Sequence, residues 1–329
     1  MPTLKDVADL AGVTVTTVSR MLNNKANVSE KTQKKIREAM KELNYLPNEV
    51  ARSLINKKSN MIGLIVPSAI NFFFANLIQY VETYVSSHNY KLLLCISDLD
   101  KDKERECFAM LNANRVDGVI VASRTQNIEK SINFKAPIVT IERALSDDVP
   151  SVSPDNYNGG ELAALSLMKA GCQNLLYIGS SHEDIEACMR LTGFSDTLRK
   201  NGVKNAEIIH AGERDYVNLS YGKVIEELFR KHPRTDGIFA ANDVIASQIL
   251  QYCHNKKIAI PKKLQIIGYD DAGLAALTTP LLSSIRQPIK EMCRAAVENI
   301  IQQSNNQTVP KRTVFPVSLI IRESGGLKL

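Results

Sequence analysis

The chain has 329 residues, of which 44% are hydrophobic and 23% are charged, and its formal net charge is +6. This length allows about two domains, and this composition is typical of a soluble globular protein and excludes a disordered chain. No apolar run reaches the roughly 18 residues that a membrane helix needs, and the first residues lack the apolar stretch of a signal peptide, so we expect a cytoplasmic protein with no membrane partner.

The positive charge is concentrated at the N-terminal end. Residues 1–58 contain eleven lysines and arginines and six acids, a balance of +5, whereas the rest of the chain contains 30 basic and 29 acidic residues. Concentrated positive charge is typical of proteins that bind a polyanion such as DNA.

The sequence contains no pattern of an enzyme or a metal protein. The six cysteines and five histidines are dispersed, without the spacing of metal ligands. A Gly-x-Ser-x-Gly turn and a phosphate-binding glycine loop are absent from the sequence. We therefore expect reduced thiols, no metal, no cofactor and no enzymatic activity.

The first segment, residues 1–46, has the pattern of a helix-turn-helix domain. Leu4, Val7, Ala8 and Ala11 recur at helical spacing, and Gly12 stops that helix. Small residues near this turn allow the next helix to cross closely, as a helix-turn-helix requires.

Two further helices complete this predicted domain. Thr14 is a suitable N-cap for a helix that reaches about Leu22, with Val18 and Leu22 facing inward. Ser29 caps a third helix, which runs from Glu30 to about Leu43 and covers the other two.

The outward face of the second helix predicts contacts in the major groove. Arg20 can form a bidentate pair with guanine, and the short side chains of Val15 and Thr16 suit a thymine methyl or a single hydrogen bond. Thr17 and Ser19 are suited to phosphate, although Thr17 could instead only support the turn. The full set of predicted DNA-binding residues is Thr3, Val15, Thr16, Thr17, Ser19, Arg20, Asn23, Asn27, Asn48, Ala51 and Leu54, with Lys31 as a possible backbone contact.

Residues 47–58 are predicted to form a hinge helix. Pro47 ends the third helix, and Asn48 can cap a short helix through Leu54. Such a short helix is marginal in water, so we expect it to fold only beside a second copy and DNA. Leu54 would then enter the minor groove as an apolar wedge, the alternative being an ordinary apolar residue of a linker.

From residue 59 to 329 short apolar runs alternate with helical patterns, which predicts parallel sheets covered on both faces. This stretch is long for one doubly wound domain, so we expect two α/β lobes with a cleft between them. The expected strands are Met61–Val66, Lys91–Cys95, Gly118–Ala122, Ile138–Ile141, Leu175–Gly179, Gly237–Ala240 and Gln265–Gly268. The expected helices are Ala75–His88, Lys103–Asn112, Gly159–Ala170, Cys188–Asn201, Leu219–Lys231 and Ile245–Lys256.

Polar and aromatic residues follow several of these strands, where ligands bind in such sheets. Asn71 follows the first strand, Asn242 follows Gly237–Ala240, and Asp270 follows the Ile266-Ile267-Gly268-Tyr269 run. A few convergent polar groups and aromatic rings in an apolar cleft suit a sugar. Asn242 and Asp270 could alternatively cap the next helix.

Together these segments resemble the lactose-repressor (LacI) family of bacterial regulators. The runs that carry the resemblance are Asp6-Val7-Ala8, Ala11-Gly12-Val13, Thr17-Val18-Ser19-Arg20 and Ala51-Arg52-Ser53-Leu54. The similarity continues to the C-terminus. It implies an N-terminal helix-turn-helix domain joined by a hinge helix to a two-lobed core like a periplasmic binding protein.

The resemblance also implies roles for residues of the cleft. Asn71, Phe73 and Phe74 form one wall, and Tyr216 is a second stacking ring. The residues implied as hydrogen-bonding partners of the ligand are Arg143, Arg190, Asn242, Asp270 and Gln287.

Two departures from the family pattern bear on the ligand. Phe72 stands where a proline is usual, and Glu142 replaces a common aspartate. The segments Leu145–Pro150 and Asp155–Gly160 resemble sucrose-operon repressors, which favours a β-fructoside or another small sugar, with ribose as an open alternative.

The mechanism implied is that of a homodimeric repressor that a sugar or sugar phosphate releases from a pseudo-palindromic operator. Two alternatives remain: a co-repressor type, in which the ligand tightens DNA binding, and a catabolite regulator with a phosphoprotein partner. A solute-binding transport component or a sugar enzyme on the same core is disfavoured by the attached DNA reader.

Overall fold

The computed structural model describes residues 2–22, 28–46, 58–123, 134–142, 145–146, 148–180, 185–203, 206–212, 215 and 218–325. The chain divides into two compact units, Met1–Ser59 and Asn60–Leu329. We call the first unit the reader and the second the core.

The reader is a small bundle of helices whose ends the sequence specifies. Thr3 and Asp6 form a reciprocal capping box at the start of the first helix, and Gly12 ends it in the left-handed conformation at φ 66°. Thr14 Oγ1 accepts a hydrogen bond from the amide of Thr17 at 3.2 Å, and Ser29 caps the third helix. The described helices are α1 (Leu4–Ala11), α2 (Val15–Leu22) and α3 (Glu30–Glu42).

The apolar positions at helical spacing meet in one cluster between these helices. Val7, Val18 and Ile36 are fully buried, one from each helix. The bounds, caps and inward faces expected for the three helices are thus confirmed, and Leu22 packs against the cluster while partly buried.

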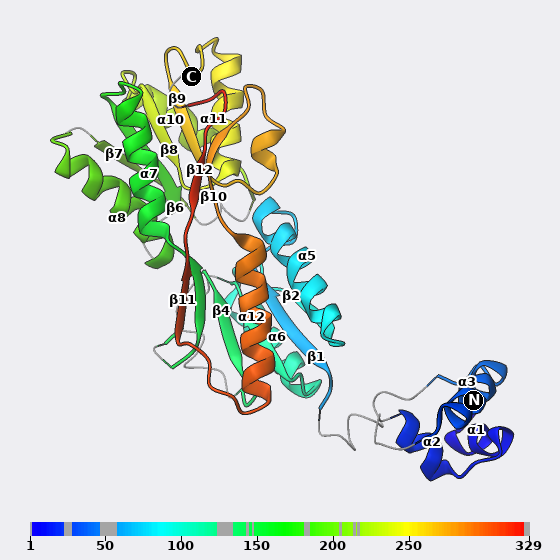
Figure 1. The fold of residues 1–329 in the computed structure, drawn as a ribbon. Coiled ribbons are helices and arrows are strands. Elements are labelled where there is room, and N and C mark those ends of the chain that lie inside the picture. Colours follow the sequence, from blue (N-terminus) through cyan, green and yellow to red (C-terminus); the bar gives the residue numbers. More distant parts are fainter. Residues whose placement is uncertain are drawn as a thin grey trace. The chain divides into compact units, whose positions relative to one another are not determined.

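The core contains two six-stranded sheets, each in its own lobe (Figure 1). The first lobe has the strand order β11-β5-β4-β3-β1-β2, and all its pairs are parallel. Helices α5 and α12 pack together against one face, and α6 contributes Phe108 and Leu111 to a cluster on the other. Its elements are β1 (Met61–Val66), α5 (Phe72–Ser87), β2 (Lys91–Ile96), α6 (Lys101–Ala113), β3 (Gly118–Val121), β4 (Ile138–Ile141), β5 (Ser151–Pro154), α12 (Ile289–Ser304) and β11 (Arg312–Phe315).

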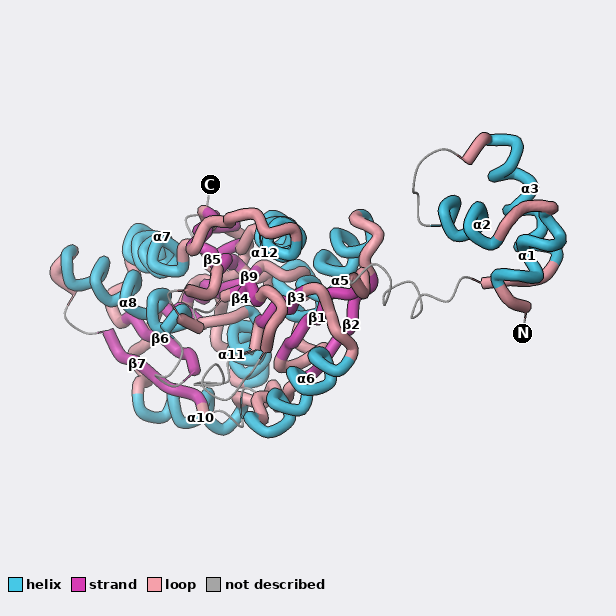
Figure 2. Tube along the Cα trace, turned by 90° about the horizontal axis from the view of Figure 1, so that it is seen from below, coloured by secondary structure: helices cyan, strands magenta, loops and turns pink. Residues whose placement is uncertain are grey.

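The second lobe has the strand order β12-β10-β9-β8-β6-β7, in which only the edge strand β12 is antiparallel to its neighbour. Helices lie on both sides of its strands; in Figure 2, β6 and β7 of this lobe can be found beside α8 and α10. Its elements are α7 (Asn156–Lys169), β6 (Leu175–Ser180), α8 (Ile185–Lys200), β7 (Ala206–Ala211), α10 (Gly222–Lys231), β8 (Gly237–Ala240), α11 (Asp243–Asn255), β9 (Gln265–Asp270), the short η2 (Leu274–Ala276), β10 (Ser283–Arg286) and β12 (Ser318–Ile320).

The chain crosses between the lobes three times. The crossings lie between β5 and α7, between β10 and α12, and between β11 and β12. Figure 1 shows α12 in the first lobe directly below β10 of the second. Each lobe is therefore built from segments that are far apart in the sequence.

All seven expected strands and all six expected core helices are present, but several helices begin about one turn earlier than predicted. Asn71, Asp155 and Asn242 each accept a hydrogen bond from an amide of the first turn and so start α5, α7 and α11 before the apolar periodicity begins. Helix α12 and the strands β5, β7, β10, β11 and β12 were not predicted from the sequence.

Candidate DNA interface and ligand cleft

The exposed face of α2 contains the residues predicted to read DNA. Val15, Thr16 and Arg20 are exposed, whereas Val18 between them is fully buried. A short helix with polar and small side chains on its outer face can enter the major groove. Thr17 and Ser19 are half-buried, at the sides of this face.

Two predicted DNA-binding residues have local structural roles. Thr3 caps α1, and its backbone amide and hydroxyl both donate to Asp6. These hydrogen bonds lower the pKa of the Asp6 carboxyl, the backbone bond being the larger cause. The hydroxyl of Thr17 lies 2.9 Å from that of Thr14. This contact is expected if Thr17 supports the turn and does not contact phosphate. The other residues predicted to contact DNA lie outside the described residues: Asn23, Asn27, Asn48, Ala51 and Leu54.

In the core, Arg190 of α8 brings together residues from both lobes. Its Nε donates to Asn156 Oδ1 at 2.7 Å, and Nη1 donates to the carbonyl of Ala241 at 2.8 Å. Its Nη2 pairs with Glu142 at the end of β4, which places a buried ion pair between the lobes. The guanidinium carbon also lies 3.8 Å from the ring centre of Tyr269.

Close packing of α7 and α8 holds this arginine in place. A Cβ on Gly160 would lie 2.0 Å from the carbonyl oxygen of Arg190, and a Cβ on Gly193 would lie 2.0 Å from that of Tyr157. Only glycine fits at such a close approach of two backbones. The second lobe thus holds Arg190 beside Ala241, which follows β8, and Tyr269 of β9.

Asp270 and Gln287 extend the network along the ends of the strands. Gln287 Nε2 donates to Asp270 Oδ1 at 2.8 Å, and both side chains are buried. Asp270 ends β9 at φ 111°, a strained backbone conformation. Such strain is often found at functional sites, which supports a functional role for this residue. Burial raises the pKa of Asp270 well above its usual range, and nearby Arg190 partly opposes this.

Asp243 is a second buried carboxyl, at the first residue of the helix that Asn242 caps. Ser284 donates to its Oδ1 at 2.6 Å. Desolvation raises the pKa of Asp243 to about 7, and the hydrogen bond from Ser284 opposes the shift. The side chain of its neighbour Asn242 accepts a hydrogen bond from the amide of Ile245 at 2.9 Å. Asn242 therefore caps the next helix, which was the alternative to a role in ligand binding.

The first-lobe wall differs in detail from the expectation. Phe73 and Phe74 are 4% and 2% exposed, and their rings meet edge to face 5.1 Å apart within the core of that lobe. The exposed ring of this turn is that of Phe72, at 42%. Asn71 caps α5 and lines a pocket of about 210 Å³ at the ends of β1 and β2.

The structure brings Arg190, Asp270 and Gln287 together and leaves Asn71 at a separate pocket. Arg143 and Tyr216 lie outside the described residues. Asn156 and Tyr269 also belong to the network, and neither was predicted from the sequence. Tyr269 lies inside a strand, and Asn156 follows β5, a strand too polar to be recognised, so only the polar run at Asp155–Gly160 indicated this position.

The described part of the chain has no helix that could cross a membrane. A DNA-reading helical unit and a two-lobed core with a buried polar network at the strand ends define a DNA-binding transcriptional regulator with a ligand-binding core. The family model of bacterial regulatory proteins, lacI family, matches residues 3–48, and that of a periplasmic binding protein-like domain matches residues 164–325.

Similar proteins extend these matches over the whole chain. The chain is 39% identical to the sucrose operon repressor of Streptococcus mutans and 34% identical to the ribose operon repressor of Bacillus subtilis, covering 98% of each protein and 98% of itself. The Lac repressor dimer bound to operator and the anti-inducer ONPF superposes with a TM-score of 0.86 at 25% identity, over 98% of both chains. This protein belongs to the LacI family of bacterial regulators.

Proposed function

We propose that this protein is a homodimeric repressor of a carbohydrate-utilisation operon, which a small sugar in the cleft releases from a pseudo-palindromic operator. The observation that carries the proposal is the network around Arg190. It joins Glu142 of the first lobe to Asn156, Tyr269 and the strand ends of the second. Such convergent donors and acceptors beside an aromatic ring suit a polyol.

Binding of the sugar would change the relation of the two lobes because the cleft residues come from both. Glu142 and Arg190 would each exchange their mutual contact for ligand hydroxyls. The hinge at residues 47–58 would transmit the change, with Leu54 as the minor-groove wedge. The coupling free energy required is modest, typically about 1–3 kcal/mol.

The effector class is argued from relatives and from the cleft. The first relatives are repressors of sucrose and ribose operons, and a regulator of 31% identity was solved with D-xylulofuranose at a TM-score of 0.72, covering 81% of this chain. Sucrose or another β-fructoside is our first candidate, with ribose second. A thermal-shift screen of sucrose, fructose, ribose and their phosphates would identify the ligand.

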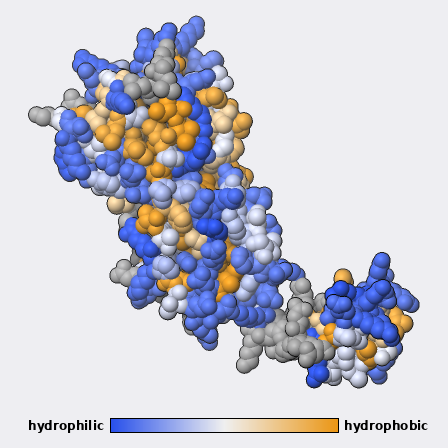
Figure 3. Space-filling view, viewed as in Figure 1, coloured by the Kyte–Doolittle hydropathy of each residue, from blue (hydrophilic) through white to orange (hydrophobic). Residues whose placement is uncertain are grey.

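Homodimer formation is supported by relatives and by exposed apolar side chains. The Lac repressor binds its operator as a dimer. Figure 3 shows apolar patches on the visible face of the core, and Leu277 and Leu281 of the second lobe are 75% and 38% exposed. A symmetric dimer would match a pseudo-palindromic operator in the cytoplasm.

The decisive experiment is Asp270→Ala, with Glu298→Ala on the exposed face of α12 as a control. Asp270→Ala should abolish release of operator DNA by the sugar while operator binding persists, because only the cleft is altered. Fluorescence anisotropy with labelled operator gives both readouts. Normal release of the Asp270→Ala variant would contradict the proposed site.

A second candidate is a co-repressor or catabolite-control regulator, in which a ligand or a phosphoprotein strengthens DNA binding. It is favoured by 30% identity to catabolite control protein A of Priestia megaterium over 98% of both chains. Tighter operator binding upon addition of the ligand in the same anisotropy assay would select this candidate.

A further inference from the structure

Asn156 is the first residue of α7 and follows the first crossing of the chain between the lobes. Its side chain is only 2% exposed, although asparagine is mostly found at the surface of proteins. The preceding residue, Asp155, already caps the helix by accepting a hydrogen bond from the amide of Asn158. The buried amide of Asn156 therefore has a role other than capping.

The side-chain oxygen of Asn156 accepts two hydrogen bonds within the network around Arg190. Arg190 Nε donates to Oδ1 at 2.7 Å, and the hydroxyl of Tyr269 donates to the same atom at 2.8 Å. Because an arginine nitrogen can only donate, the atom that it meets must be an acceptor, which fixes the orientation of the amide. All three side chains are buried, where hydrogen bonds are stronger than at the surface.

Asn156 is one of the partners that set the plane of the guanidinium. Arg190 Nη1 donates to the carbonyl of Ala241 at 2.8 Å, and the ring of Tyr269 stacks against the group. These contacts come from the second lobe, whereas Glu142, the partner of Nη2, comes from the first. Since the guanidinium is planar, bonds at Nε and Nη1 fix its orientation. The second lobe thus holds Arg190 with Nη2 directed at the first lobe.

The backbone around Asn156 is itself held in place. The amide of Asp155 donates to the carbonyl of Phe315, the last residue of β11, at 2.8 Å. Two of the three crossings therefore meet at the start of α7. A Cβ on Gly159 would lie 2.6 Å from the ring of Tyr269, so this turn of α7 packs closely against that side chain. A short side chain on such a support can orient a long and flexible arginine.

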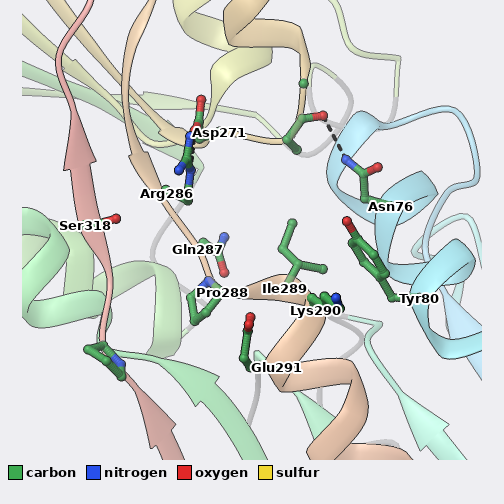
Figure 4. Close-up of a pocket in the computed structure, with 13 residues that line it drawn as sticks. Asn76, Tyr80, Asp271, Arg286, Gln287, Pro288, Ile289, Lys290, Glu291 and Ser318 are labelled. Carbon is green, nitrogen blue, oxygen red and sulfur yellow. Dashed lines mark hydrogen bonds and ion pairs between the residues drawn. The ribbon is translucent and has the colours of Figure 1, made fainter. Parts of the chain in front are cut away.

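Gln287 has a similar arrangement at another crossing. It lies between β10 and α12, and Figure 4 shows it next to Pro288, at the start of α12. Its Nε2 donates to Asp270 Oδ1 at 2.8 Å. At two crossings, therefore, a buried amide side chain is hydrogen-bonded to a residue that the proposed function assigns to the sugar.

We propose that Asn156 is a positioning residue for the ligand, which holds the guanidinium of Arg190 in the orientation that the sugar requires before the sugar enters. This inference rests on the proposed function, in which Arg190 contacts the sugar. Without Asn156, the arginine side chain must be ordered when the sugar binds, and such ordering weakens binding by up to about tenfold.

The test separates the acceptor of Asn156 from its shape. Asn156→Leu keeps the branched shape but removes the acceptor, so the affinity for sugar should fall about tenfold. Asn156→Asp keeps an oxygen acceptor in place, so its affinity should stay within about threefold of that of the unchanged protein. Isothermal titration calorimetry of the full chain with sucrose, fructose and ribose measures these affinities.

NMR of the Arg190 Nε–H group distinguishes positioning from a purely structural role. With isotope-labelled arginine, this group should exchange its hydrogen slowly in the unchanged protein and in Asn156→Asp, because its hydrogen bond persists in a buried place. Asn156→Leu should lose this protection. The signal is assigned by its disappearance in Arg190→Lys.

Asn158→Leu is the matched control, because it is the same substitution in the same turn of α7. The side-chain nitrogen of Asn158 lies 3.4 Å from Glu161 Oε2, away from the guanidinium. Its affinity for sugar should equal that of the unchanged protein. If circular dichroism shows that Asn156→Leu does not fold, Asn156→Ser replaces it, since the serine hydroxyl is too short to accept from Nε.

Three results overturn the inference: Asn156→Leu or its serine replacement binds sugar as tightly as the unchanged protein, Asn156→Asp loses as much affinity as these variants, or the Arg190 signal stays protected in them. The proposed function fails by a different result. If sugar binds the unchanged protein but does not change its operator binding, the proposed function is contradicted and the role of Asn156 stands. If none of the three sugars binds the unchanged protein, both proposals fall.

Discussion

Arg190 has partners from four segments of the core, and its position illustrates how much one residue organises. Asn156, Ala241 and Glu142 accept hydrogen bonds from the guanidinium, and Tyr269 packs beneath it. Family resemblance predicted Arg190 but not these partners. Arg190 and Asn156 are 34 residues apart along the chain, and Asn156 and Tyr269, which also form a hydrogen bond, are 113 residues apart. Such distant contacts have no local sequence signal.

Replacement of Arg190 should expose the cost of an unpaired buried charge. Arg190→Met leaves Glu142 buried and charged, which should lower the free energy of unfolding by about 3–5 kcal/mol. The double variant Arg190→Met, Glu142→Gln should recover part of this loss. Urea denaturation of both variants and of Glu142→Gln completes the cycle, and an additive result would show that the two side chains do not interact.

The raised pKa of Asp243 predicts a stability that depends on pH. In the folded protein the carboxyl of Asp243 keeps its proton up to a pKa of about 7, whereas in the unfolded chain it releases the proton near its ordinary pKa of 3.8. The folded state therefore binds more protons between these values, and this contribution to stability is present at low pH and lost as pH rises through 7.

Asp243→Asn removes this titration. The fall in unfolding free energy between about pH 5 and pH 8 should be smaller in the variant than in the unchanged protein, measured by urea denaturation at each pH. Part of the fall should remain, because the pKa of Asp270 is raised too. Identical pH profiles would mean that Asp243 is ionised throughout this range.

At the scale of elements, the sequence predicted the reader closely and the core incompletely. The reader helices have amphipathic spacing and caps within a few residues, which are local signals. The core strands β5 and β10 have only four residues each, and each contains two serines, so they lack an apolar run. Helix α12 buries Ile289, Cys293 and Ile300, so its helical periodicity is a local signal from which the helix could have been predicted.

The close packing of α7 against α8 can be tested by substitution of a glycine. Gly160→Ala should push the two helices apart, because its Cβ would overlap the carbonyl of Arg190. We expect a loss of unfolding free energy of about 1–3 kcal/mol and weaker sugar binding. Gly222→Ala at the start of α10 meets nothing within 4 Å and should be close to neutral. Equal stability of both variants, by thermal denaturation, would contradict close packing there.

At the scale of the whole molecule, the two compact units carry different charge. Nearly all the excess positive charge lies within residues 1–58, whereas the remainder is close to neutral. This division was evident from the sequence alone, since charge needs no fold to be counted. This division of charge predicts that added salt weakens DNA binding much more than it weakens sugar binding.

Operator affinity should therefore fall roughly a thousandfold or more between about 50 and 200 mM salt, because bound cations are released from DNA. Sugar affinity of the same preparation should change by less than about threefold, since a neutral ligand displaces no condensed ions. Anisotropy and calorimetry measure the two. A salt-independent operator affinity would argue against phosphate contacts by the reader.

The three crossings of the chain between the lobes affect the order in which the lobes can fold during synthesis. During translation, β1 to β5 emerge long before α12 and β11, which complete the same lobe. Until α12 and β11 have been made, the strand β5 of the nascent first lobe lacks its edge partner and α5 alone covers the face that it later shares with α12. A stop codon after β10 would thus leave the first-made lobe incomplete, because α12 and β11 follow β10 in the sequence.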